Sequence, residues 1–186
     1  AMQRNIEAFD FLLTADAEEG ARPLVALPDL PLGLPRRGED RAVATSDLTA
    51  HPLAGGRARL VLEARDDAGQ MAETAPLLID LPTRPFRNPL AAAIVEQRRL
   101  LASDARQAKT VAGTFETLGD LGAAFIDRPG EILGLRVARN RILLARDDAQ
   151  LKPVLDYLWQ MALTIEAGDS SPAAERLADA REALKK

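Results

Sequence analysis

The spacing of apolar residues changes near the middle of the chain. In residues 57–64 every second side chain is apolar and its neighbours are mostly charged, which is typical of a β-strand with one buried face. From Pro89 onward, apolar residues recur at every third or fourth position, as in an amphipathic helix. The pattern therefore predicts strands in the first half of the chain and helices in the second.

Further strands are expected at residues 5–14, 24–27, 41–48 and 73–81. The segment 66–69, Asp-Asp-Ala-Gly, provides a glycine for a positive φ and predicts the turn of a hairpin. Short strands separated by turn clusters are typical of a small antiparallel sandwich. We expect an immunoglobulin-like β-sandwich in the first half.

The second half is expected to contain four or five helices. They cover residues 89 to about 107, 110–125, 129–145, 148 to about 168, and 173–186. Short connections favour antiparallel packing of neighbouring helices. The last pattern reaches the final residue without a glycine or proline stop, so we expect a truncated C-terminal helix and a chain that is a piece of a longer protein.

The two patterns meet in residues 81–101, LPTRPFRNPLAAAIVEQRRLL. Pro82 and Pro85 fix φ and interrupt regular structure, whereas Asn88 followed by Pro89 is a helix cap with a proline at the first helical position. The predicted fold class is therefore α+β, with a β-sandwich-like domain at residues 1–86 and a helical domain at residues 87–186.

Composition narrows the classes of function. The 186 residues are 47% hydrophobic and 28% charged, as in ordinary globular proteins. The net charge is −4, and residues 1–86 hold fourteen acidic and nine basic side chains, which argues against nucleic acid as a partner. The absence of cysteine excludes disulfides and thiolate metal sites, and no run of apolar residues has the length of a membrane span.

His51, the single histidine, is the first candidate for chemistry because Ser46 and Asp47 lie nearby in the sequence. A catalytic triad needs its members to converge, and residues this close along one strand usually point apart. A metal site on His51 would need Asp47, Asp66 or Asp67, whose spacing does not enforce convergence. We therefore expect a loop histidine, and no catalytic, metal-binding or cofactor-binding residues.

The candidate interaction residues are Arg136, Arg139, Arg146 and Trp159. The three arginines can share one side of the third predicted helix and bind an anionic surface, the alternative being a solvated helix face. Trp159 lies in the fourth predicted helix, where it is either an interface anchor or a partly buried member of the helical core.

Three segments resemble the DUF4175 family, which groups large, membrane-anchored alphaproteobacterial proteins of unknown function. They are DLTAHPLAGGRARLVLEARDDAGQ (47–70), LPTRPFRNPLAAAIVEQRRLL (81–101) and LDYLWQMALTIEAGDSSPAAERLADAREALK (155–185). The resemblance implies an extracytoplasmic middle region, located in the periplasm, whose membrane attachment lies in segments outside this chain. The family has no established activity, so it assigns no catalytic residues here.

The main functional hypothesis is a non-enzymatic interaction or scaffolding module of a cell-envelope protein, which binds another protein or a cell-wall component. One alternative is an envelope hydrolase or ligand-binding domain that uses His51 with nearby carboxylates. Another is an oligomerisation domain formed by the helices.

Overall fold

The computed structural model describes residues 6–16, 19–32, 43, 45–66, 68–125 and 128–169. It divides into a β unit, Ala1–Glu19 with Val25–Thr83, and a helical unit, Gly20–Leu24 with Arg84–Lys186. The division after Thr83 lies three residues before the predicted boundary. The short segment Gly20–Leu24 is the larger difference, because it belongs to the helical unit although it comes from the β half of the sequence.

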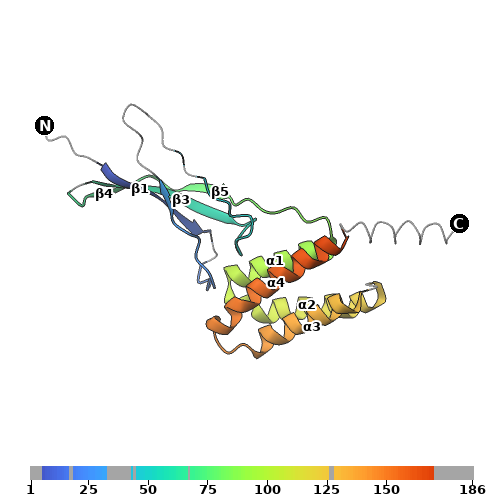
Figure 1. Ribbon diagram of the computed structural model, residues 1–186. Helices are drawn as coiled ribbons and strands as arrows, with labels where there is room; N and C mark the ends of the chain where they lie inside the picture. Colours follow the sequence, from blue (N-terminus) through green and yellow to red (C-terminus); the bar gives the residue numbers. More distant parts are fainter. Residues whose placement is uncertain are drawn as a thin grey trace. The chain divides into compact units, whose positions relative to one another are not determined.

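The described strands of the β unit form one antiparallel sheet (Figure 1). Its central strands are β1 (Ile6–Ala15) and β3 (Arg57–Asp66), with β2 (Leu30–Leu32) on the outer side of β1. The shorter strands β4 (Met71–Glu73) and β5 (Leu77–Asp80) both pair with β3. The α+β class is confirmed, whereas the immunoglobulin-like sandwich stays a prediction because the described ranges contain a single sheet.

The alternation in residues 57–64 produces β3 as expected. Ala58 is fully buried, and its neighbours Arg57 and Arg59 are exposed and form ion pairs with Asp16. At the end of β3, the Asp66 carboxylate accepts hydrogen bonds from the backbone N–H groups of Ala68 and Gln70, and Gly69 has φ +76°. The predicted turn is confirmed, and its return strand is interrupted between β4 and β5.

Two strand predictions differ from the structure. Residues 24–27 are irregular because the Leu24 N–H donates to the carbonyl of Ala102 in the helical unit, so that it is not available to a sheet. The strand predicted at residues 41–48 falls partly outside the described residues, and residues 45–48 have no strand conformation.

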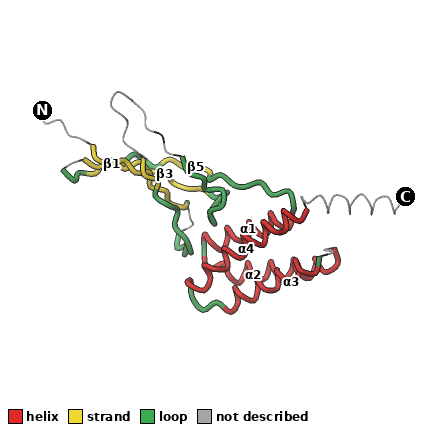
Figure 2. Tube along the Cα trace, viewed as in Figure 1, coloured by secondary structure: helices red, strands yellow, loops and turns green. Residues whose placement is uncertain are grey.

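The helical unit contains four described α-helices arranged as two pairs, α1 beside α4 and α2 beside α3 (Figure 2). Their bounds are α1 Pro89–Ser103, α2 Ala108–Phe125, α3 Pro129–Leu144 and α4 Asp148–Asp169, with a short 3-10 helix, η1 Ala105–Gln107, after α1. The fifth predicted helix lies outside the described residues. The core comprises the fully buried Ile94, Leu101, Phe115, Leu135, Leu155 and Leu158. Each such side chain stabilises the fold by about 1.5–3 kcal/mol.

The helix ends follow from local chemistry. Asn88 caps α1, since its side chain accepts from the N–H groups of Leu90 and Ala91. Helix α1 ends earlier than predicted because Asp104 adopts an extended conformation and caps η1 instead. Asp147 precedes α4, and its carboxylate accepts from the Gln150 N–H at 2.9 Å.

Candidate functional site

Helix α3 is apolar on two opposite faces. Leu135, Ala138 and Ile142 are buried in the unit's core. On the other side lie the apolar Leu133, Val137 and Leu144, with the polar Asn140 between Val137 and Leu144, at spacings of four, three and four residues. Leu133 is 63% exposed and Leu144 is 76% exposed, which is unusual for side chains of this size. We call these four residues the outer stripe of α3.

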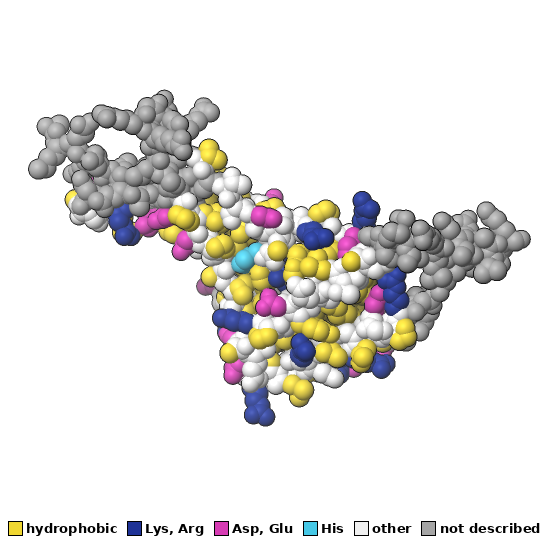
Figure 3. Space-filling model, in the orientation of Figure 1, with side chains coloured by type: hydrophobic (Ala, Val, Ile, Leu, Met, Phe, Trp, Pro, Cys, Tyr) yellow, Lys and Arg dark blue, Asp and Glu magenta, His cyan; other side chains and the backbone are white. Residues whose placement is uncertain are grey.

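The outer stripe is bordered by arginines. Arg136 is exposed and, among the described residues, takes part in no ion pair. Arg141 lies over the ring of Tyr157 at 4.3 Å, and the Tyr157 hydroxyl donates to the carbonyl of Gly134. Figure 3 shows hydrophobic side chains interspersed with both basic and acidic ones on the visible face of the helical unit. The exposed face of α3 is therefore both apolar and cationic.

A groove of about 210 Å³ lies between α2 and α3. Its lining has an apolar floor and charged walls, formed by Phe115, Glu116, Gly119, Asp120, Arg136, Arg139 and Asn140. Arg139 donates to the Glu116 carboxylate at 2.9 Å, while its Nε atom is buried and has no hydrogen-bond partner in the described part of the chain. The structure thus brings together two of the predicted interaction residues, Arg136 and Arg139.

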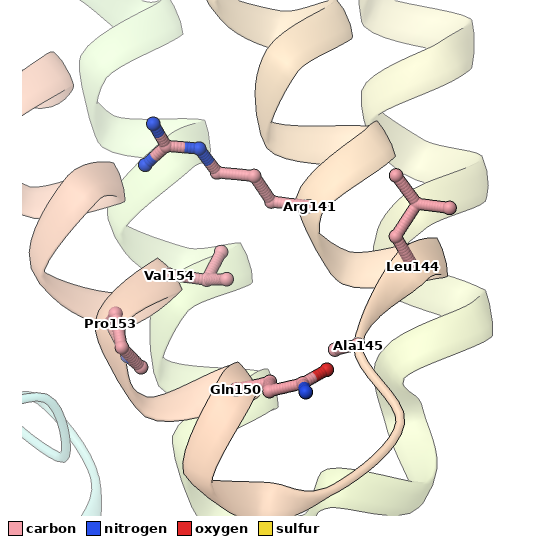
Figure 4. A pocket seen from close by; sticks show the side chains of 6 residues that line it. All are labelled: Arg141, Leu144, Ala145, Gln150, Pro153 and Val154. Atoms are coloured by element: carbon pink, nitrogen blue, oxygen red, sulfur yellow. The ribbon is translucent and has the colours of Figure 1, made fainter.

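A second cavity, of about 360 Å³, lies where α3 ends and α4 begins. In Figure 4 the Arg141 side chain reaches across this cavity from α3, and Val154 faces it from α4. Leu144 and Pro153 add apolar surface, and Gln150 contributes its amide, which accepts from the N–H of Arg146. This lining suits an apolar group better than an ion.

Arg146 is not on the same helix face as Arg136 and Arg139. Helix α3 ends at Leu144, and Ala145 is extended with ψ 129°, so the helical spacing that grouped the three arginines stops before Arg146. The side chain of Arg146 is exposed in the connection to α4.

Trp159 is half-buried and packs inside the helical unit. Its ring meets Phe86 edge to face at 5.7 Å, and the guanidinium of Arg98 lies 4.8 Å from its centroid. Arg98 is 3% exposed and donates to the Leu155 carbonyl at 2.9 Å. Trp159 is thus a partly buried residue of the helical unit, whose ring is covered in part by Phe86 and Arg98.

Two residues tie α1 to α4. The spacing of Arg98 from Ile94 and Leu101 places it on the buried stripe of α1. Glu166 accepts hydrogen bonds from the backbone N–H groups of Arg87 and Asn88, which ties the end of α4 to the start of α1. No sequence signal connects residues that lie 78 or 79 positions apart.

The polar side chains of Asp47 and His51 form hydrogen bonds with residues two positions further along the chain. The Nδ1 atom of His51 accepts from the Leu53 N–H at 3.2 Å. The Asp47 carboxylate accepts from both the N–H and the hydroxyl of Thr49, and hydrogen bonding by Thr49 lowers the Asp47 pKa. Asp66 serves the hairpin turn described above. In the described ranges, no group of His, Asp and Glu side chains is arranged to hold a metal ion.

Fold and surface together define the class: a two-unit α+β protein whose helical unit presents an exposed apolar helix face bordered by arginines. The chain belongs to the DUF4175 family, described as a domain of unknown function, whose family model matches residues 7–186. This match confirms the resemblance seen in the three sequence segments. No curated protein and no solved structure matches the chain. None of the described helices combines the length and apolarity needed to cross a membrane.

Proposed function

We propose that this chain is a non-enzymatic interaction module of a membrane-anchored cell-envelope protein, acting on the periplasmic side of the membrane. The observation that supports the proposal is the second apolar face of α3. A helix that has its inner face in a core has no structural need for leucines on its outer face. These leucines therefore suggest a surface kept for binding.

The partner that fits best is an envelope protein presenting an acidic amphipathic helix. The spacing of the outer stripe matches the ridge that a second helix packs against. Helix α3 carries Arg136, Arg139 and Arg141 but a single acidic residue, Glu131. Carboxylates beside the partner's apolar ridge would meet these guanidinium groups.

Apolar burial would supply most of the affinity. Covering Leu133 and Leu144 contributes on the order of 1.5–3 kcal/mol each, whereas an exposed ion pair contributes about 0–1 kcal/mol. The arginines would mainly select the partner and its orientation, and mutation of the leucines should have the larger effect on binding.

The test is cross-linking and co-purification of the full-length membrane protein with its envelope neighbours. Replacing Leu133 and Leu144 together by Gln should abolish capture of the partner. The matched control is Leu121→Gln, because Leu121 is 59% exposed but belongs to α2. Equal capture by both variants would contradict the proposal.

An oligomerisation domain is the second candidate, favoured by the same outer stripe, which a second copy of α3 could also cover. Light scattering of the purified chain distinguishes partner binding from oligomerisation. Dimers that dissociate in the Leu133→Gln/Leu144→Gln variant would replace the partner-binding proposal, and a monomer at high concentration would remove the dimer.

A further inference from the structure

The groove between α2 and α3 has charges of opposite sign on its two walls. Glu116 and Asp120 come from α2, and Arg136 and Arg139 come from α3. The Glu116 and Arg139 side chains already pair with each other at 2.9 Å. Asp120 and Arg136 are exposed at the rim and are not paired with each other. The groove therefore offers one anionic and one cationic group to a ligand.

One feature of the lining distinguishes this groove from an ordinary surface furrow. Gly119 is buried, yet a Cβ atom added to it would meet nothing within 4 Å. The absence of this side chain leaves open space in the lining of the groove.

We propose that the groove binds a small zwitterion of the α-amino acid class. The ligand's carboxylate lies against Arg136, while its ammonium group faces Asp120. The open space at Gly119 takes the ligand's apolar part. The volume of 210 Å³ accommodates roughly seven water-sized groups at about 30 Å³ each, which suits an amino acid as small as alanine.

This site shares Arg136 and Asn140 with the partner surface proposed above, but each surface also has residues of its own that test it separately. Substitutions of Leu133 and Leu144 should leave zwitterion binding unchanged. A substitution at Gly119 should leave capture of the protein partner unchanged. Failure of one proposal is therefore distinguishable from failure of the other.

The experiment is a ¹⁵N–¹H NMR titration of the full chain with L-alanine, compared with acetate and ethylamine at the same ionic strength. We expect saturable shifts at groove residues with alanine, and at least tenfold weaker binding of acetate and ethylamine, each of which lacks one of the two charges. Arg136→Gln and Asp120→Asn should each weaken alanine binding at least tenfold.

Gly119→Leu provides the test of location, because its side chain grows into the groove from a position with free space. Alanine binding should be lost in this variant. The matched control, Gly113→Leu, makes the same change on the same helix outside the groove, where an added Cβ also meets nothing, and should bind like the unaltered chain. Thermal unfolding of both variants verifies that they fold.

Three results would overturn the proposal. One is the absence of saturable shifts with alanine in the unaltered chain. Another is equal binding of alanine and acetate, which would indicate a simple anion site. The third is equal alanine binding by folded Gly119→Leu and Gly113→Leu, which would place the ligand elsewhere.

Discussion

Arg98 lies among apolar side chains in the helical unit with only 3% of its surface exposed. Burial lowers its pKa to about 10, an effect that the nearby charge of Asp156 opposes, so the guanidinium remains protonated at neutral pH. The cost of burying this charge is offset by the hydrogen bond to the Leu155 carbonyl and by the face of Trp159. Arg98 thereby links α1 to α4.

Replacing Arg98 by Ala should lower the free energy of unfolding by about 2–3 kcal/mol, because both the charged hydrogen bond and the packing against Trp159 are lost. Urea unfolding followed by Trp159 fluorescence measures the change. Arg99→Ala is the control, since Arg99 pairs with Glu96 near the surface. Its loss should lower the free energy of unfolding by about 0.5 kcal/mol. Equal losses in the two variants would show that Arg98 is not part of the core.

Asp104 is the residue whose ionisation should matter most for stability. Hydrogen bonds from the Arg106 side chain, together with those from the backbone of Arg106 and Arg22, lower its pKa to about 2, although its partial desolvation acts in the opposite direction. Since the folded-state pKa is below the ordinary value of 3.8, the ionised carboxylate contributes stability above about pH 4. This contribution is lost as the pH falls from about 4 towards 2.

We therefore expect Asp104→Asn to be less stable than the unaltered chain at pH 6, and the difference to shrink as the pH falls below 4. Thermal melts between pH 2 and 6 provide the measurement. Melting curves that stay equally separated at every pH would mean that the charge of Asp104 does not support the fold.

At the scale of elements, α3 and α4 approach each other closely at Gly134. A Cβ atom added there would lie 2.8 Å from Met161 Cε and 3.1 Å from Met161 Sδ. Both atoms belong to a flexible side chain, so Met161 can shift at some cost. The glycine thus permits the contact through which Tyr157 donates to the Gly134 carbonyl.

The comparison of Gly134→Ala with Gly113→Ala isolates this contact. Both changes raise helix propensity by up to about 1 kcal/mol. Gly113→Ala should show that gain, as nothing surrounds the new methyl group, while Gly134→Ala should be close to neutral because Met161 must move. Chemical denaturation would reveal the difference, and equal gains would argue against close packing at Gly134.

The elements also show what sequence reasoning can reach. The alternation in β3 and the cap-plus-proline signal of α1 were predictable, because these features depend on neighbours in sequence. The strand predicted at residues 24–27 was wrong, since its backbone partner is Ala102, which no local pattern reveals. In the candidate surface, Arg136 and Arg139 were predictable from helical spacing. Glu116 and Asp120 were not, because they lie on a different helix.

At the scale of the whole molecule, the segment Gly20–Leu24 belongs to the helical unit, although in the sequence it lies between the two parts of the β unit. The Ala105 N–H donates to the Arg22 carbonyl, the Arg22 N–H donates to Asp104, and Arg22 pairs with Asp148. Leu24 is 3% exposed. The helical unit is therefore completed by residues that precede most of the β unit in the chain.

Leu24→Ala should consequently destabilise the helical unit by about 2–5 kcal/mol, as for other buried leucines. Trp159 fluorescence reports on this unit alone, since Trp159 is the only tryptophan. Leu48→Ala, in the β unit at 8% exposure, should leave the Trp159 transition unchanged. If Leu48→Ala shifted the Trp159 transition and Leu24→Ala did not, the segment Gly20–Leu24 would belong to the β unit.

The sequence by itself determined the α+β class, the change from strands to helices near residues 81–101, and the family. Each of these depends on periodicity, on caps and prolines, or on motifs that are local along the chain. The tertiary structure alone decided that Trp159 packs against Phe86 and Arg98 inside the helical unit. It also decided that Gly20–Leu24 completes the helical unit, and that α3 keeps a second apolar face exposed beside a groove of opposed charges. These features depend on side chains brought together from distant positions, and such contacts are set by packing rather than by local pattern.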